Sequence, residues 1–279
     1  MIKKEDGPIK LYLSDLDGTL LNNNTAISDY TKKTLKKLID DGLCFSVATA
    51  RTAATVSDFF EGIAISAGVL MNGTVVFDFQ KEEYLVVHKI PENALSDILE
   101  ILDKYPVSPF IYSVCGKYLN VYHKKLTKEY ELSFYEPRKN RRLKKFFEIS
   151  SFDEIPNKDE IIYSCLLTDK ETAENIKAEI NRLEGISAIC YKDNLGDFYY
   201  VEIMSQKASK ASGALWLKNY YNAETLIAFG DNLNDIPLLE VADKKIAVEN
   251  AVEPLKDISD IIIESNHNDG VIKFIEKDI

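Results

Sequence analysis

The sequence predicts an α/β protein in which a parallel-sheet core is interrupted by an α+β insert. Three observations support this prediction: strand and helix patterns alternate over residues 9–63, the alternation returns over residues 209–279, and the composition changes between them. Such alternation is typical of a parallel sheet covered by helices. We therefore expect a core formed by residues 1–82 and 197–279 and an insert formed by residues 83–196.

The N-terminal part reads as strand, helix, strand and helix. Residues 9–14 form a short apolar run that predicts a buried strand, and Ser28 caps a helix whose apolar residues recur at helical spacing until Gly42. A second apolar run at residues 43–48 predicts the next strand, and a helix is expected over residues 53–63. This order favours parallel pairing of the two strands.

The expected insert carries many of the basic and aromatic residues of the chain. After a strand, a helix and paired strands, its patterns predict a strand, a helix and two further strands at residues 160–167, 170–183, 186–191 and 198–203. A basic run over residues 138–145 is more typical of a solvated face than of a binding site.

The C-terminal part returns to alternating elements. A helix, a strand and a second helix are expected, followed by two short strands, at residues 209–220, 225–229, 233–241, 245–248 and 261–263. The chain then ends in a helix after Asn268. Because strands and helices alternate in the same way at both ends of the chain, we expect the two ends to form one sheet.

Composition and charge exclude several classes of protein. The chain has 279 residues, 46% hydrophobic residues and a formal net charge of −11, so it can bury a core but repels nucleic acids and anionic membranes. We find neither an apolar run that spans a membrane nor a signal peptide. The four scattered cysteines are expected as buried free thiols in a reducing compartment. We expect a cytoplasmic protein with no nucleic-acid or membrane partner, and we predict no oligomeric state.

Carboxylates follow two of the predicted strands, while the three histidines are too scattered to favour a zinc site or a Ser-His-Asp hydrolase. Asp15 and Asp17 come directly after the first strand, Asp231 follows the strand at residues 225–229, and Asp235 comes one helical turn later. Ligands bind at the carboxyl ends of parallel strands, so we expect these side chains near one another. Each motif alone also fits a turn or a helix cap, but the two together favour a Mg²⁺ site.

Two weaker motifs offer groups for phosphoryl oxygens. Thr49, Ala50 and Arg51 follow the second strand and provide a hydroxyl, a backbone N–H and a guanidinium. Lys210 lies at the start of a predicted helix and can neutralise phosphate charge, although such lysines are usually solvated. Residues 72–73, Asn-Gly between two apolar runs, are most simply a hairpin turn rather than a substrate contact.

Taken together, these motifs resemble the haloacid dehalogenase superfamily of phosphohydrolases, and specifically its Cof-like branch with a type IIB cap. Four stretches carry the resemblance in the family's order: Asp15–Leu21, Thr49–Arg51, Lys210 and Gly230–Asp235. Ala50 and Ala211 stand where the family often has glycine, which concerns only loop geometry. The resemblance implies a Rossmann-like core and an inserted α+β cap domain that selects the leaving group.

The resemblance also implies roles for these residues. Asp15 is expected to be the nucleophile that forms an aspartyl-phosphate, and Asp17 the general acid and base. Mg²⁺ would be held by Asp15, the backbone carbonyl of Asp17 and Asp231. Asp235 would be a further ligand or a support for the others. The phosphoryl group and substrate would be contacted by Leu16, Thr49, Ala50, Arg51, Lys210 and Asn234.

The expected function is therefore a Mg²⁺-dependent phosphatase acting on small phosphorylated metabolites, such as sugar phosphates or similar monoesters. Two alternatives share the fold: a phosphomutase and a non-catalytic sugar-phosphate sensor. Release of inorganic phosphate separates the phosphatase from the mutase, and turnover of any kind excludes the sensor. Because a sensor needs no nucleophile and acid together, the presence of both Asp15 and Asp17 argues against it.

Overall fold

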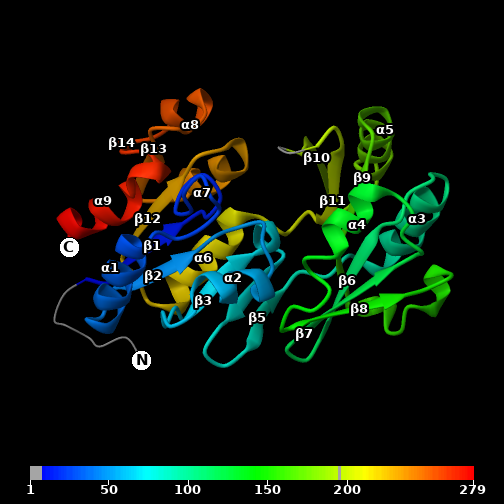
Figure 1. Ribbon diagram of the computed structural model, residues 1–279, viewed down its shortest axis with the longest axis horizontal. Coiled ribbons are helices and arrows are strands. Elements are labelled where there is room, and N and C mark those ends of the chain that lie inside the picture. The colour runs from blue at the N-terminus through cyan, green and yellow to red at the C-terminus, as the bar shows by residue number, and fades with distance from the viewer. Residues whose placement is uncertain (1–7, 194–195) are drawn as a thin grey trace. The chain divides into compact units, whose positions relative to one another are not determined.

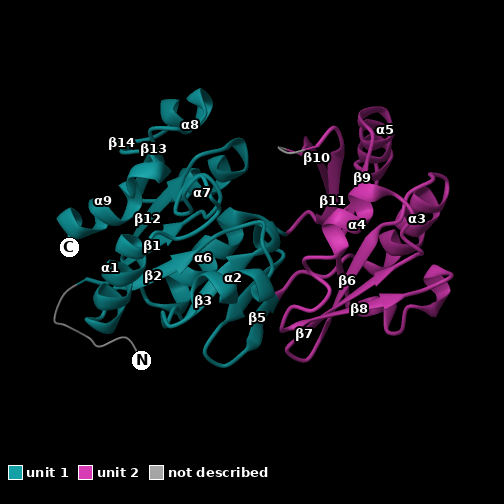
Figure 2. Ribbon diagram, in the orientation of Figure 1, with its two compact units in different colours: residues 1–86, 208–279 teal, residues 87–207 magenta. Residues whose placement is uncertain are grey.

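The computed structural model describes residues 8–193 and 196–279, and the chain forms two compact units (Figures 1 and 2). Unit 1 comprises residues 1–86 and 208–279, and unit 2 comprises residues 87–207. Unit 2 is therefore one continuous insertion into the sequence of unit 1. The predicted class, an α/β protein with a parallel core and an α+β insert, is confirmed.

The core of unit 1 is a five-stranded parallel sheet with the strand order β14-β13-β12-β1-β2. Every neighbouring pair is parallel. The strands are β1 Lys10–Ser14, β2 Cys44–Val47, β12 Thr225–Gly230, β13 Lys244–Val248 and β14 Ile261–Ile263. In the centre, β1 pairs with β12 so that Ser14 lies opposite Phe229. This pairing brings together the carboxyl ends of two strands that are far apart in the sequence.

The helices of unit 1 connect these strands. They are α1 Asp29–Asp40, α2 Ala53–Phe59, α6 Lys210–Tyr220, α7 Ile236–Glu240, α8 Glu253–Asp257 and α9 Gly270–Asp278. Short 3₁₀ helices lie at η1 Met71–Gly73, η4 Leu233–Asp235 and η5 Asn266–Asn268. Helices α1 and α9 contact each other, and α6 contacts α7 and β3 (Ala67–Leu70). The helix predicted over residues 233–241 therefore starts as a 3₁₀ turn.

Two helix boundaries illustrate how local sequence directs unit 1. The Ser28 hydroxyl accepts a hydrogen bond from the backbone N–H of Thr31 at 3.0 Å, so the predicted cap of α1 is confirmed. The helix predicted over residues 53–63 is too long, since α2 ends at Phe59. The chain leaves the helical path there and turns through Gly62, whose φ of +77° is not helical.

A three-stranded sheet completes unit 1, in the order β3-β4-β5. Strands β4 Val75–Asp78 and β5 Glu83–Val87 follow β3 in the chain. Strands β3 and β4 are antiparallel, with Leu70 opposite Val75, so the hairpin predicted at residues 72–73 is confirmed. The hairpin tip packs against the start of α6: a Cβ on Gly73 would come within 2.0 Å of the Ser209 carbonyl oxygen.

Unit 2 contains a six-stranded mixed sheet with the order β10-β11-β9-β6-β7-β8. The strands are β6 Phe110–Cys115, β7 Tyr118–His123, β8 Lys144–Glu148, β9 Ile161–Thr168, β10 Ile186–Lys192 and β11 Tyr199–Ser205. All neighbours are antiparallel except β7 and β8. The helices are α3 Glu92–Asp103, α4 Glu129–Tyr135 and α5 Lys170–Ile180, with 3₁₀ turns η2 Phe152–Glu154 and η3 Lys158–Glu160.

One face of this sheet forms the apolar core of unit 2 together with α3 and α5. Ile111, Leu166 and Val201 from three strands pack there with Ile98 of α3 and Ile176 of α5. The period of two along each strand sends the intervening residues to the opposite face. The helix predicted over residues 170–183 is three residues too long, since α5 ends at Ile180.

The four cysteines are free, as predicted. Cys44 and Cys165 are buried, whereas Cys190 is half-buried and Cys115 is exposed, so the expectation of burial holds for two of them. Among the described residues we find no helix that combines the length and the apolar character needed to cross a membrane.

The contact between the hairpin tip and α6 generates a stability prediction. Gly73→Ala adds a Cβ at a φ of +91° and against the Ser209 carbonyl, so we expect it to lower the free energy of unfolding by about 3 kcal/mol. Gly62→Ala is the matched control, because its φ is also positive but its Cβ meets no described atom within 4 Å. That change should cost only about 1 kcal/mol. Urea denaturation measures both, and equal losses would contradict the proposed clash.

Candidate active site

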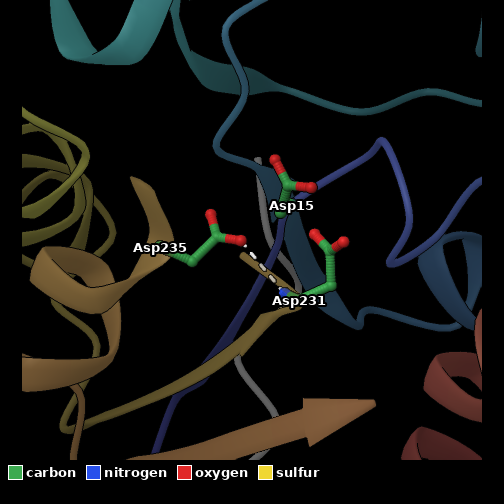
Figure 3. A group of neighbouring side chains, drawn as sticks. All are labelled: Asp15, Asp231 and Asp235. Carbon is green, nitrogen blue, oxygen red and sulfur yellow. Dashed lines mark hydrogen bonds between the residues drawn. The ribbon is translucent and has the colours of Figure 1, made fainter. Parts of the chain in front are cut away.

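Three carboxylates converge where β1 and β12 end. Asp15 directly follows β1, and its backbone N–H donates to the Phe229 carbonyl of β12 at 3.0 Å. Asp231 directly follows β12, and Asp235 ends η4. One carboxylate oxygen of each aspartate lies within 4.8 Å of the others. Figure 3 shows the three side chains grouped around one point. The parallel pairing of β1 with β12 therefore creates this cluster.

Lys210 supplies the positive charge of the cluster. Its Nζ donates to Asp15 Oδ1 at 2.7 Å and to Asp235 Oδ1 at 2.6 Å, and its side chain is 1% exposed. The Ser209 hydroxyl caps α6 by accepting from the N–H of Ser212, which fixes Lys210 as the first helical residue. Lys210 is therefore not a solvated lysine, which is what a lysine at the start of a helix usually is.

Asp235 is held by donors on both of its oxygens. Besides the bond from Lys210 to Oδ1, Oδ2 accepts from the backbone N–H groups of Asp231 and Asn232 at 3.0 and 3.1 Å; the first of these is the dashed line in Figure 3. A Cβ on Gly230 would come within 2.6 Å of the Asp235 Cβ. Asp235 therefore closes the loop after β12 and orients Asp231.

The loop after β1 reaches Asp231 from the other side. The Thr19 hydroxyl donates to Asp231 Oδ1 at 3.2 Å, and Gly18, at a φ of +79°, passes so close that a Cβ there would lie 2.2 Å from Asp231 Oδ2. Asn250 donates to the Gly18 carbonyl at 2.8 Å. Neither Thr19 nor Asn250 was a predicted site residue. Thr19 stands within a recognised motif, but no local pattern marks Asn250.

Burial and mutual repulsion dominate the electrostatics of the cluster. Burial, together with the charges of Asp235 and Asp231, raises the pKa of Asp15 well above its ordinary value, although Lys210 opposes this shift. Burial and the Asp235 charge raise the pKa of Asp231 to about 7. Burial alone would lower the pKa of Lys210, but its bonds to Asp15 and Asp235 outweigh it and raise the pKa. Lys210 is therefore a fixed cation.

The charge balance makes the cluster a candidate metal site. Three aspartates against the one Lys210 ammonium leave an excess of two negative charges when all are ionised. An oxygen-only donor set with this excess suits a hard divalent cation such as Mg²⁺ better than a soft metal. Both Asp235 oxygens already accept hydrogen bonds, so Asp15 and Asp231 are the better placed ligands.

Asp17 and Arg51 form a separate pair. Arg51 donates from Nε to Asp17 Oδ2 at 2.7 Å and from Nη2 to Asp17 Oδ1 at 2.6 Å. The guanidinium also lies 4.9 Å from the centre of the Phe59 ring. The Asp17 side chain is half exposed, in contrast to the buried cluster. The motifs that contain Asp17 and Arg51 thus lie side by side. Arg51, which was expected to contact the substrate, is bonded to Asp17 instead.

The remaining predicted residues occupy different environments. Thr49 is buried and its hydroxyl accepts from the Arg51 N–H at 3.2 Å, while Ala50 beside it is half-buried. Leu16 is fully buried within the turn after β1. Asn234 is exposed, and the hydrogen bonds that we find among the described residues do not join it to the aspartates. The structure therefore brings together Asp15, Asp231, Asp235 and Lys210, but not Asn234.

Comparison with known proteins agrees with this geometry. A family model described as haloacid dehalogenase-like hydrolase matches residues 12–275. The chain is similar to the 5-amino-6-(5-phospho-D-ribitylamino)uracil phosphatase YitU of Bacillus subtilis (strain 168), with 26% identity over 94% of this chain and 95% of that protein.

Two solved structures show the same fold. A haloacid dehalogenase-like hydrolase from Bacteroides thetaiotaomicron has a TM-score of 0.80 at 22% identity, over 97% of this chain and 100% of that chain. A subclass IIB sugar phosphatase of the same superfamily has a TM-score of 0.71 at 20% identity, over 96% and 98% of the two chains. The match extends over both units.

The shared lysine generates a second stability prediction. Lys210→Met leaves buried carboxylates without their cation, so we expect the free energy of unfolding at pH 7 to fall by about 3–5 kcal/mol. Lys33→Met, at an exposed position of α1, should leave stability unchanged. Thermal and urea denaturation in the presence of a chelator measure both variants. A stable Lys210→Met protein would mean that the cluster does not depend on this charge.

Proposed function

The chain belongs to the haloacid dehalogenase-like hydrolases, and from this premise we propose that it is a Mg²⁺-dependent phosphatase of small phosphorylated metabolites, such as sugar phosphates or similar monoesters. One observation carries the proposal: Asp15 lies at the end of a central strand, beside a fixed cation and two further carboxylates. YitU acts on a phosphorylated ribityl compound, and the IIB relative acts on sugar phosphates, which favours this substrate class.

In the first proposed step, the Asp15 carboxylate attacks phosphorus. A bond forms between an Asp15 oxygen and phosphorus while the bond from phosphorus to the leaving oxygen breaks, and Asp17 donates a proton to that oxygen. Because Arg51 donates to both Asp17 oxygens, the Asp17–Arg51 pair has to open and Asp17 has to take up a proton from solvent before it can donate one. Asp15 then carries the phosphoryl group.

In the second proposed step, Asp17 takes a proton from a water molecule as the water oxygen attacks phosphorus. The bond between Asp15 and phosphorus breaks, inorganic phosphate leaves, and both aspartates return to their starting states. Lys210 keeps its charge throughout and offsets the negative charge of the phosphoryl oxygens. A Mg²⁺ ion held by Asp15, the Asp17 carbonyl and Asp231 would supply further charge neutralisation when bound.

The remaining predicted site residues are proposed to contact the substrate in the same mechanism. We propose that the backbone N–H groups of Leu16 and Ala50 and the Thr49 hydroxyl hold phosphoryl oxygens, and that Asn234 turns toward them when substrate binds. Arg51, released from Asp17, would contact the substrate. The free cysteines are consistent with a reducing cytoplasm as the working compartment.

Replacement of the nucleophile tests the proposed function. Asp15→Asn removes the attacking carboxylate, so hydrolysis of an aryl phosphate with Mg²⁺ should fall by about 1,000-fold or more. Asp41→Asn, an exposed aspartate after α1, is the control and should keep full activity. Assays of inorganic phosphate and of isomerised phosphate esters distinguish a phosphatase from a mutase. Turnover by Asp15→Asn at the wild-type rate would refute the assignment.

Removal of a ligand tests the metal site independently of activity. Mg²⁺ at ten times its dissociation constant should stabilise the wild-type protein by about 1.4 kcal/mol relative to the chelated protein. Asp231→Asn should lose this stabilisation because a neutral amide replaces the charged ligand, whereas Asp41→Asn should retain it. Thermal denaturation with and without chelator gives the comparison. Equal Mg²⁺ responses in all three proteins would exclude Asp231 as a ligand.

A further inference from the structure

Asn250 lies in the loop after β13 and bonds to two other loops at the carboxyl edge of the parallel sheet of unit 1. Its Nδ2 donates to the Gly18 carbonyl in the loop after β1 at 2.8 Å, and its Oδ1 accepts from the backbone N–H of Asn266 at 3.0 Å. Asn266 begins η5, which follows β14. Because β12 lies between β13 and β1 in the sheet, Asn250 connects the loops on either side of the strand that precedes Asp231.

The orientation of the Asn250 amide is determined by its two partners. A backbone carbonyl can only accept a hydrogen bond and a backbone N–H can only donate one, so Nδ2 faces Gly18 and Oδ1 faces Asn266. Asn266 is itself held, since its buried side chain donates to the Leu21 carbonyl at 2.8 Å and to Asn23 Oδ1 at 3.3 Å. Both asparagines therefore bond to the loop after β1, at separate points along it.

The residue that Asn250 holds is a glycine, which has more backbone freedom than any other residue. Gly18 has a φ of +79° and no Cβ to limit its torsion angles, so a bond to its carbonyl supplies a restraint that the residue itself lacks. Asp17 precedes Gly18 in the chain and Thr19 follows it. The Thr19 hydroxyl donates to Asp231 Oδ1 at 3.2 Å. The torsion angles of Gly18 therefore determine where its two neighbours lie relative to Asp231.

The loop after β13 also holds the backbone of Asp231. The N–H of Val252, two residues after Asn250, donates to the Asp231 carbonyl at 2.8 Å. Gly18 and Asp231 are in turn close to each other, because a Cβ on Gly18 would lie 2.2 Å from Asp231 Oδ2. The separation of the two loops that carry the proposed Mg²⁺ ligands therefore depends on a third loop, to which none of these ligands belongs.

We propose that Asn250 is a positioning residue. By holding the Gly18 carbonyl, it sets the affinity of the site for Mg²⁺ and the place from which Asp17 transfers its proton; both roles rest on the proposed function. When this bond is lost, the loop after β1 samples further conformations, and the apparent affinity for the ion falls in proportion to the fraction that stays competent. Asn266 orients Asn250 and anchors the loop at Leu21, so its larger contribution is to stability.

A purely structural role of the two asparagines predicts a different order of effects. Asn266 is 7% exposed, whereas Asn250 is an exposed residue. Removal of the Asn266 side chain deprives the buried Leu21 carbonyl of its donor, so Asn266→Ala should cost more stability than Asn250→Ala. If Mg²⁺ affinity followed stability alone, Asn266→Ala would also weaken Mg²⁺ binding more. If Asn250 positions the loop, the order for Mg²⁺ binding is reversed.

Thermal denaturation over a series of Mg²⁺ concentrations tests this order without any need for turnover, because the midpoints give the apparent dissociation constant. The proteins are the wild type, Asn250→Ala, Asn266→Ala and the control Asn219→Ala, in which an exposed asparagine of α6 is changed. Asn250→Ala should raise the dissociation constant about 5-fold, Asn266→Ala less than about 2-fold, and Asn219→Ala not at all. A wild-type dissociation constant for Asn250→Ala, or a greater rise for Asn266→Ala, overturns the proposal.

Kinetics with an aryl phosphate at saturating Mg²⁺ gives a second measure. Because Lys210 and the other proposed phosphoryl contacts stay in place, Asn250→Ala should lower kcat about 10-fold while KM changes less than about 2-fold. An unchanged kcat overturns the part of the proposal that concerns Asp17. If Asn250→Ala does not fold, Asn250→Ser, whose hydroxyl is too short to reach the Gly18 carbonyl, replaces it under the same criteria.

Failure of this proposal and failure of the proposed function give different results. If the wild-type protein turns over no phosphate ester, the proposed function fails, but the Mg²⁺ series still decides whether Asn250 sets the affinity. Turnover together with equal Mg²⁺ affinity in all four proteins supports the proposed function and overturns the role of Asn250. A wild-type protein that Mg²⁺ does not stabilise overturns both.

Discussion

The Lys210 ammonium, shared between Asp15 and Asp235 in a buried place, is the interaction on which the candidate site depends. Two carboxylates cannot stay ionised side by side in a low-dielectric interior without a cation. Lys210 opposes the rise in the pKa of Asp15 that burial and the neighbouring carboxylates cause, and it ties α6 to the ends of β1 and β12. One ion pair therefore links the chemistry of the site to the packing of unit 1.

Close backbone contacts also restrict where the side chains of the candidate site can lie. Gly18 and Gly230 pass within contact distance of Asp231 and Asp235, and Gly73 presses against the residue that caps α6. A side chain at any of these three positions would displace a carboxylate or the lysine. The loops that carry the aspartates are thus held by steric contact, which limits the side-chain freedom that substrate binding would otherwise have to remove.

Unit 2 contains a second buried lysine, Lys144 of β8, whose surroundings differ from those of Lys210. Lys210 and Lys144 both stand at the start of an element, but Lys210 has two carboxylate oxygens within 2.7 Å, whereas the Lys144 Nζ lies 5.6 Å from the centre of the Tyr112 ring. The first pKa is raised and the second lowered. A buried lysine bonded to carboxylates keeps its charge, whereas one that lies among aromatic rings loses its proton more readily.

Sequence alone determined the fold class, most strands, the cap of α1 and the set of aspartates at strand ends, because apolar periodicity, capping residues and turn residues act over a few positions. The predicted lengths of α2 and α5 were too great, because the ends of these helices depend on where the chain turns to pack against other elements. Only the tertiary structure decided that Arg51 pairs with Asp17, that Asn250 holds the loop after β1, and that Lys144 is buried. The reason is physical: each of these facts depends on residues far apart in the chain, and no local pattern encodes which distant side chain will share a buried charge.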